Sequence, residues 1–432
     1  MNLLLFMALV AKIVTFNIGL GAATTTVPVT GVGFTPTALI LWWSGRTESV
    51  DTIGRDHIKS GIGFVTGTAN RLCSTVTSEN AVATSDSYRA MYNDACIAAI
   101  TVAGAVDGLA DLQSLDSDGF TLVIDSQFAT NLRICALCIG GTANALAIDF
   151  ATNTVTGNQD ITSIGFQGDV VLFAASRSIA AFGTIEAVSY QGIGAAVSSS
   201  QRFTIANVAD DASATSDTYS YAKSTECLTL LSASSTATRF RADFVSWLSN
   251  GFTINILEHS DANAMKVICL VLKGGSWIVG NLLTQTNTVT DIVESGFGFA
   301  PIGGLFASHT KAENTTVSVP HAELSMGAFD SISSRAVQDS LDRDAVTTME
   351  CTTAIEFDEV YANISTASTI DGLMDIKSKD SGGFTCIMDD ADPLQSFVGY
   401  IAFGNIISPA SWHPPIEKPY PPKLEVVDYY SH

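Results

Sequence analysis

The stretch DLQSLDSDGFT, residues 111–121, decides the fold of this chain because the chain contains it in three versions. It returns as DFVSWLSNGFT at residues 243–253 and as DIKSKDSGGFT at residues 375–385. The glycine near the end of each copy lies 132 residues after the one before it. A period of this length is too long for a solenoid repeat and fits a small domain. The sequence therefore predicts three tandem domains built to one plan.

Each copy of the repeat consists of short runs rich in Val, Ile, Thr and Phe, separated by Gly, Asn, Asp and Ser. Examples are residues 38–43, 120–125 and 132–139. This pattern is typical of antiparallel β-sandwiches and barrels. We therefore expect an all-β protein of three homologous antiparallel β-sandwich domains, jelly-roll-like, with an extended C-terminal arm. The expected boundaries are 1–143, 144–276 and 277–407 for the repeats and 408–432 for the arm.

The amino-acid composition limits the kinds of molecule that this protein is expected to bind. The 432 residues are 47% hydrophobic and only 15% charged, with a net charge of −22. Such a chain can build full cores, which excludes wholesale disorder. The acidic balance argues against nucleic acid and against an anionic membrane surface, because both attract basic proteins. An acidic, solubilising surface is the simplest interpretation of the charge.

The eight cysteines suggest no metal centre. Cys135 and Cys138 form a C-x-x-C pair, but they lie in an apolar run that is typical of a strand. Residues three apart on a strand point to opposite faces and cannot bind one ion together. We therefore expect buried free thiols and a reducing site of synthesis, with no disulfide framework, metal or cofactor.

The repeated stretch itself suggests structural roles. Asp118-Gly119, Asn250-Gly251 and Gly382-Gly383 are the dipeptides of type I′ hairpins. Asp111, Asp243 and Asp375 recur at one register between apolar neighbours. We expect these carboxylates to be buried and hydrogen-bonded to backbone or hydroxyl groups, as structural ties.

Trp42, Trp43 and Arg46 form the candidate interface in repeat 1. Adjacent residues on a strand point to opposite faces, so we expect only one Trp to enter the core. The alternatives for the pair are a subunit interface, core or rim packing, or stacking on a sugar, and the interface is favoured because Trp and Arg dominate binding hot spots.

The Pro-rich tail supplies the remaining candidate residues: Trp412, Tyr420, Tyr429 and Tyr430. Its prolines exclude a helix or central strand and favour an extended chain. The tail is either a frayed end or an arm that lies on a neighbouring chain, and its apolar side chains favour the arm.

Several motifs together resemble a known class of protein. They are the Gly33-Phe34-x-Pro36 turn, the WWSGRTE run at 42–48, TSDSY at 84–88, NDAC at 93–96 and DGFT at 118–121. They resemble repeated β domains in virion structural proteins of tailed bacteriophages. The resemblance covers all three repeats and is fullest in the first. It implies a component of the tail, tail tip, fibre or capsid decoration.

On this basis we expect a non-enzymatic structural protein of the virion, synthesised in the host cytoplasm. Its expected partners are other virion proteins and copies of itself. The alternative is a carbohydrate-binding adhesin that recognises a host surface glycan through loop 44–60 and its counterparts. An exposed aromatic platform on each domain would favour the adhesin.

Overall fold

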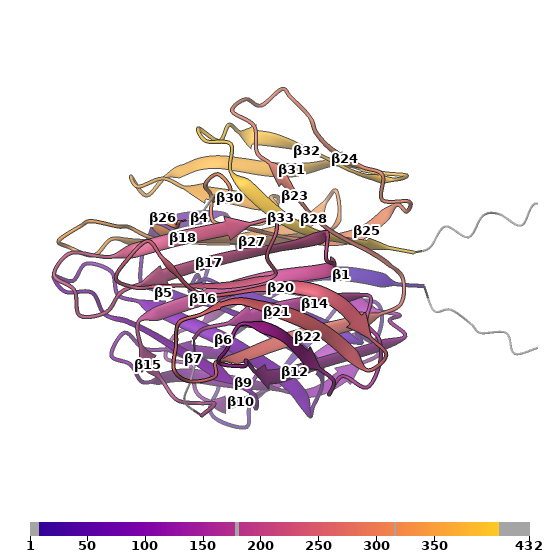
Figure 1. Cartoon of the computed structure of the whole chain (residues 1–432), viewed down its shortest axis with the longest axis horizontal. Helices are drawn as coiled ribbons and strands as arrows, with labels where there is room; N and C mark the ends of the chain where they lie inside the picture. Colours follow the sequence, from indigo (N-terminus) through magenta and orange to yellow (C-terminus); the bar gives the residue numbers. More distant parts are fainter. Residues whose placement is uncertain (1–7, 178–180, 315–316, 406–432) are drawn as a thin grey trace, which may run out of the picture.

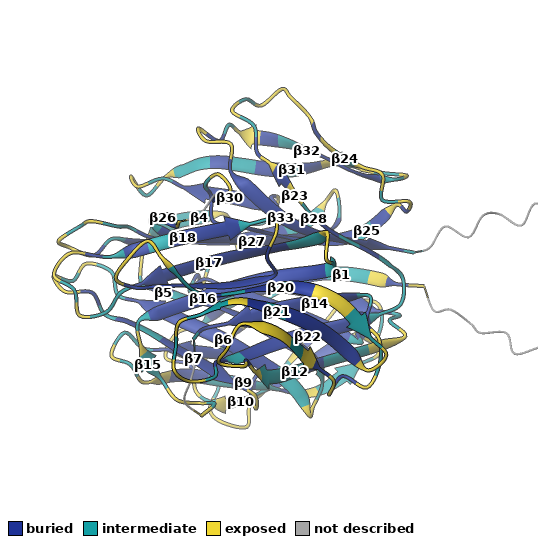
Figure 2. Cartoon of the chain, viewed as in Figure 1, coloured by how far each residue is buried: buried dark blue, intermediate teal, exposed yellow. Residues whose placement is uncertain are grey.

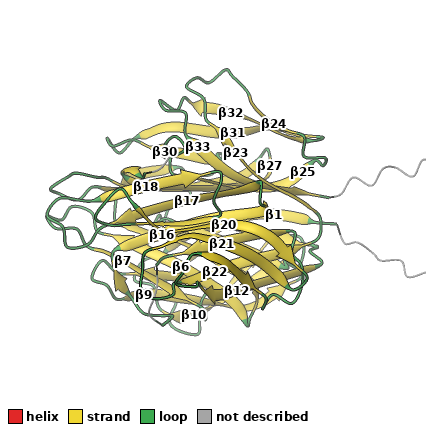
Figure 3. Ribbon diagram, in the orientation of Figure 1, coloured by secondary structure: helices red, strands yellow, loops and turns green. Residues whose placement is uncertain are grey.

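The computed structural model describes residues 8–177, 181–314 and 317–405, and this part of the chain consists of strands and loops without a helix (Figure 3). The strands form six antiparallel sheets, a seven-stranded and a four-stranded one for each repeat. The prediction of an all-β antiparallel protein is therefore confirmed.

The three pairs of sheets have the same strand order. For repeat 1 the seven-stranded sheet is β1 (Val10–Ile18), β11 (Leu132–Gly140), β3 (Ala38–Trp43), β5 (Ile58–Gly67), β6 (Asn70–Ser78), β7 (Ser87–Tyr92) and β15 (Glu186–Ala187), and the four-stranded sheet is β2 (Thr26–Thr30), β10 (Gly119–Ser126), β9 (Val106–Asp116) and β8 (Ile97–Ile100). For repeat 2 they are β12 (Asn144–Ala151), β22 (Lys266–Lys273), β14 (Val170–Ala175), β16 (Ser189–Ser198), β17 (Gln201–Ala209), β18 (Thr218–Lys223) and β26 (Val319–Pro320), with β13 (Gly157–Ile161), β21 (Gly251–His259), β20 (Thr238–Leu248) and β19 (Leu228–Leu231). For repeat 3 they are β23 (Ser276–Leu283), β33 (Phe397–Gly404), β25 (Pro301–Ser308), β27 (Ala322–Ser331), β28 (Ser334–Asp342), β29 (Cys351–Glu356) and β4 (Thr52–Arg55), with β24 (Ile292–Ser295), β32 (Gly383–Asp390), β31 (Ile370–Asp380) and β30 (Tyr361–Ile364).

The last strand of each seven-stranded sheet comes from another repeat. Strand β4 of repeat 1 pairs with β29 of repeat 3, β15 of repeat 2 with β7 of repeat 1, and β26 of repeat 3 with β18 of repeat 2. We call these three short strands the clasps. Each repeat gives one clasp and receives one, so the exchange closes into a ring.

One hydrophobic cluster joins all three repeats. It contains Trp42 and Ile62 of repeat 1, Phe203 of repeat 2, and Met326 and Phe403 of repeat 3. The seven-stranded sheets surround this cluster, while four-stranded sheets such as that of β30–β32 lie at the periphery (Figure 1). Figure 2 shows the central strands as predominantly buried.

Each seven-stranded sheet is buried on both faces. In β11, Cys135, Leu137 and Ile139 point into the shared cluster, while Ala136 and Cys138 point into a second cluster with the four-stranded sheet. This explains the nearly continuous apolar runs, since a strand covered on both faces has no polar side. Two parts of the cysteine prediction are confirmed: Cys135 and Cys138 lie on opposite faces, and all eight cysteines are buried and free.

The repeated stretch forms the same hairpin in every repeat, as predicted from the 132-residue period. Gly119 pairs with Asp116, Gly251 with Leu248 and Gly383 with Asp380. The expected type I′ turn is wrong, however. The pairing places Ser117 and Asp118 at the centre of the first turn, and neither has a positive φ.

The glycine is needed for a different reason, namely a close approach of backbone. A Cβ at Gly119 would overlap the carbonyl oxygen of Val29 on the neighbouring strand β2. Gly251 and Gly383 meet the carbonyl oxygens of Ile161 and Glu294 in the same way. Glycine is therefore required where the edge strand crosses the end of the hairpin.

Candidate functional site

One loop of each repeat meets the equivalent loops of the other two. We call these three loops, residues 79–86, 210–217 and 343–350, the junction loops. Each is hydrogen-bonded to the other two through the backbone. Ser85 and Ser216 show the pattern: the N–H of Ser85 donates to Ser213 O (2.9 Å), and the N–H of Ser216 donates to Val346 O (2.9 Å). The N–H of Met349 donates to Val82 O (2.8 Å), which closes the circle.

Side chains fix the same geometry in each junction loop. Asp211 Oδ1 accepts from the N–H of Ser87 (3.0 Å), and Asp344 Oδ1 accepts from that of Thr218 (2.9 Å). In the remaining loop Asn80 Oδ1 accepts from the N–H of Cys351 (3.0 Å). The acceptor and the donor belong to different repeats in every case. The TSDSY motif and its echo TSDTY in repeat 2 thus mark contacts between the repeats.

One residue of each junction loop lies in the left-handed region of backbone space. Ala81, Ala212 and Ala345 have φ values of 66°, 58° and 59°. This conformation costs a residue with a Cβ about 1–2 kcal/mol. It persists in all three loops because the hydrogen bonds between repeats hold it there.

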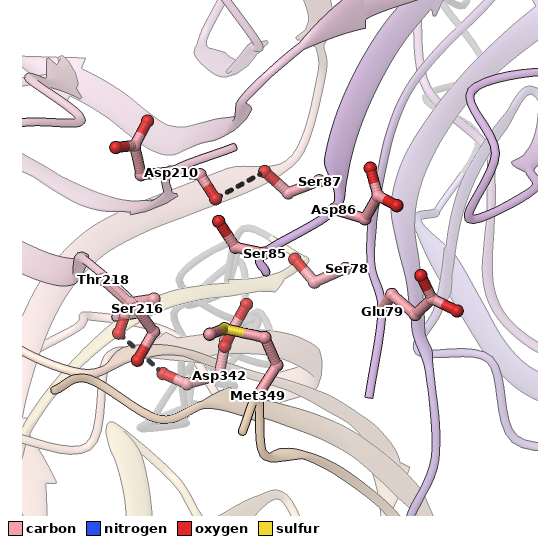
Figure 4. Close-up of a pocket in the computed structure, with 10 residues that line it drawn as sticks. All are labelled: Ser78, Glu79, Ser85, Asp86, Ser87, Asp210, Ser216, Thr218, Asp342 and Met349. Carbon is pink, nitrogen blue, oxygen red and sulfur yellow. Dashed lines mark hydrogen bonds between the residues drawn. The ribbon is translucent and has the colours of Figure 1, made fainter. Parts of the chain in front are cut away.

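A pocket lies inside the circle of junction loops. Four acidic residues line it, Glu79, Asp86, Asp210 and Asp342, together with serines, Thr218 and Met349 (Figure 4). Ser87 Oγ donates to Asp210 O (3.1 Å), and Thr218 Oγ1 donates to Asp342 O (2.9 Å). Among the described residues no Lys, Arg or His lines this pocket. The described lining is therefore made of acidic and neutral residues.

A second pocket adjoins the first, and Ser78 and Asp342 line both. Its other polar side chains include Gln191, Asn207 and Ser340, and together these residues come from all three repeats. We call the two pockets together the axial pocket. Asp342 is 5% exposed, and its burial raises its pKa to about 7.

Gln191 is the unusual member of this lining. It is only 2% exposed, and neither its amide oxygen nor its amide nitrogen has a hydrogen-bond partner. Buried amide groups nearly always have partners, so an unpaired one calls for an explanation. Nothing in the sequence marks Gln191 or Asp342, because they belong to different repeats and only the tertiary structure brings them to one cavity.

The structure corrects the expectation for the Trp pair. Trp42 and Trp43 are each 1% exposed, so neither lies at the surface. Trp43 enters the core between the two sheets of repeat 1, and Trp42 enters the cluster shared by the three repeats. The second face of this strand is covered by other repeats of the same chain, which the alternation rule alone does not show. The interface that Trp42 occupies is internal to the chain.

Arg46 is also internal. It is 7% exposed and its guanidinium donates to Glu48 (3.0 and 2.8 Å) and to the backbone and side-chain oxygens of Thr353 in repeat 3 (3.4 and 3.2 Å). The hydrogen bonds from Arg46 lower the pKa of Glu48 to about 2. Arg46 thus ties the first clasp to the strand that receives it.

Asp111, Asp243 and Asp375 are half-buried, and each forms an ion pair that the sequence analysis missed. Their partners are Arg71, Arg202 and Arg335. Asp111 Oδ1 also accepts from the N–H of Leu112 (2.6 Å), beside a bulge at residue 113. Each pair links the seven-stranded sheet to the four-stranded sheet of its own repeat. Burial raises the pKa of Asp375 to about 6.

The remaining candidates, Trp412, Tyr420, Tyr429 and Tyr430, lie outside the described residues. The described part of the chain ends at Asn405, whose side chain accepts from the N–H of Leu9 (2.6 Å) and donates to Leu9 O (3.1 Å). The two ends of the described chain therefore lie together, as Figure 1 also shows.

Comparison with known proteins adds no family. The chain matches no model of a protein family, and no curated protein is detectably similar to it. In the described part of the chain, no group of three or more His, Cys, Asp and Glu is arranged to hold a metal ion. A helix able to cross a membrane is also absent from the described ranges.

Proposed function

We propose that the protein is a non-enzymatic structural component of a tailed-bacteriophage virion, in which one chain supplies a unit equivalent to a trimer. In this proposal each repeat is a jelly-roll-like β-sandwich, and the particle site is the tail, tail tip, fibre or capsid decoration. The observation that carries the proposal is the closed exchange of clasps around one shared core. The resemblance of the sequence motifs supplies the virion context.

The closed ring suits a building block. The seven-stranded sheets are fixed to one another by backbone pairing at the clasps and by hydrogen bonds between the junction loops. In the described part of the chain these contacts hold the three repeats against one another, so the unit presents a fixed surface to its neighbours. The proposed partners are other virion proteins and copies of itself.

The alternative function, a carbohydrate-binding adhesin, has less support from the structure. Loop 44–60 and its counterparts contain the clasps, so they are engaged in contacts between repeats. In the described part of the chain, every large hydrophobic side chain that is exposed is a Val, Leu or Ile. An aromatic platform for sugar stacking is therefore not found among these residues.

The C-terminal arm, residues 408–432, is proposed to bind a neighbouring chain, on the strength of its sequence. Deleting residues 411–432 should leave the melting temperature of the monomer nearly unchanged and weaken its incorporation into particles. A truncated chain that melts at a much lower temperature and still assembles normally would contradict the proposed role of the arm.

The proposed function itself is tested by mapping purified virions. Antibodies to the full chain should label assembled particles, and a particle density map should show three-lobed units that fit one chain. Full-length protein that is absent from purified virions, and that binds host-surface glycans in a glycan array, would overturn the proposal in favour of the adhesin.

A further inference from the structure

The axial pocket is a polar cavity in an otherwise apolar interior. The three hairpins β5–β6, β16–β17 and β27–β28 contribute Ile62, Phe203 and Met326 to the shared hydrophobic cluster. The same hairpins contribute Ser78 of β6, Gln191 of β16 and Asp342 of β28 to the lining of the cavity. Each part of the cavity has room for about one water-sized particle, a water molecule or a small ion.

The lining selects the charge of the occupant. Asp342 is the buried acidic residue that lines both pockets, and the neutral polar side chains of the first pocket bear hydroxyl groups. Arg343, the cation on the third junction loop, is engaged with Glu350 (2.6 Å) and does not line the pocket. No basic residue is among the described residues that line the cavity, so the Asp342 carboxylate would repel an anion and attract a cation.

The unpaired amide of Gln191 points to an occupant of the second pocket. Its two polar atoms are buried without a partner, and this burial costs free energy unless something binds them. An amide oxygen and a carboxylate are hard oxygen ligands of the kind that Ca²⁺ accepts, with water completing the shell. His and Cys, the ligands typical of zinc, do not line either part of the pocket among the described residues.

We propose that the axial pocket binds one small oxygen-coordinated cation, with the Asp342 carboxylate and the Gln191 amide oxygen as its protein ligands. The site lies where the three repeats meet, so the bound ion links them and stabilises the closed ring. One buried carboxylate with neutral oxygen ligands makes a site of low charge. We therefore expect a dissociation constant of about 10⁻⁴–10⁻³ M, the range of weak calcium modules.

The test uses the full chain, treated with chelator and dialysed into low salt. Its melting temperature is followed while CaCl₂ is added, with tetramethylammonium chloride at matched ionic strength as the control for screening. We expect a saturable rise with CaCl₂ and none with the bulky cation, because only an ion that binds the folded state stabilises it specifically. The same saturable rise with NaCl supports the site and identifies a monovalent ion. No saturable rise with any small cation overturns the proposal.

Three variants separate this site from general charge effects. Asp342→Asn and Gln191→Met keep the side-chain volume nearly unchanged and should abolish the saturable rise. Asp291→Asn removes a carboxylate from an exposed ion pair with Lys377 and should retain it. If Gln191→Met keeps the full response to CaCl₂, Gln191 is not a ligand and the proposal fails. Near-UV circular dichroism of each variant before titration confirms that the fold is present, and the Gln191 variant provides the test if Asp342→Asn does not fold.

Discussion

Arg46 offers the sharpest test of how the repeats are held together. The change is Arg46→Ala, which removes the guanidinium that joins the first clasp to Thr353 of repeat 3. The backbone pairing of β4 with β29 would remain, but Glu48 would lose its partner. We therefore expect the first clasp to detach at a lower denaturant concentration than in the unmodified protein.

The magnitude follows from two contributions. The pKa of Glu48 lies at about 2 instead of 4.5, and a difference of this size corresponds to roughly 3 kcal/mol before screening. Because the Glu48 side chain is 32% exposed, solvent reduces this to about 1–2 kcal/mol. Leaving the partly paired oxygens of Thr353 without a donor adds about 1 kcal/mol. We therefore expect Arg46→Ala to lower the free energy of unfolding by about 2–3 kcal/mol in total.

The assay is urea unfolding of the full chain at several pH values, with Lys377→Ala as the matched control. Lys377 pairs with Asp291 at the surface, where the two side chains are 49% and 38% exposed. That substitution should cost less than about 0.5 kcal/mol.

The pH dependence gives a second readout for Arg46. The folded pKa of Glu48 is lowered, so its contribution to stability is complete above about pH 4.5 and is lost as the pH falls toward 2. The difference between the unmodified chain and Arg46→Ala should therefore shrink between pH 6 and pH 3. Equal losses for the Arg46 and Lys377 variants at neutral pH would refute the reasoning.

Three further predictions concern other parts of the fold. Gly251→Ala should destabilise the chain by about 2 kcal/mol or more in urea unfolding, because its Cβ would overlap the carbonyl oxygen of Ile161; Gly67→Ala, with nothing near its Cβ, should cost less than about 1 kcal/mol. Asp111→Ala should lower the free energy of unfolding by about 1–3 kcal/mol, because it leaves Arg71 unpaired. A thermal melt indistinguishable from that of the unmodified chain would contradict the structural role of Asp111. Asp342 should make the protein less stable as the pH rises from about 4 to 7: its folded pKa of about 7 exceeds the unfolded value near 3.8, so the folded state binds the extra proton in this range. In metal-free buffer Asp342→Asn should flatten this part of the melting-temperature profile, and an unchanged slope would exclude Asp342 as its source.

The sequence could predict whatever follows from local pattern and from the internal period. The alternation of short apolar runs and turn residues indicates strands, and the 132-residue period requires equivalent hairpins at Gly119, Gly251 and Gly383. The opposite directions of Cys135 and Cys138 follow from the two-residue period of any strand. These features are determined by neighbours in sequence.

Contacts between repeats were decided only by the tertiary structure. A strand pattern shows that Trp42 and Trp43 point to opposite faces, but it does not show what covers each face. The run ALILWW, with all six residues buried, carried the available signal, since an unbroken apolar strand predicts cover on both sides. The clasps are two to four residues long, too short for a periodic pattern.

The axial pocket shows the same limit most clearly. Ser78, Gln191 and Asp342 are each more than a hundred residues from the next, and no motif connects them. Within a single repeat each is an ordinary polar residue on a strand. They form one cavity only because three sheets with a common plan close around a shared core, and the sequence of each repeat specifies its own sheets without specifying which residues of the other repeats lie opposite.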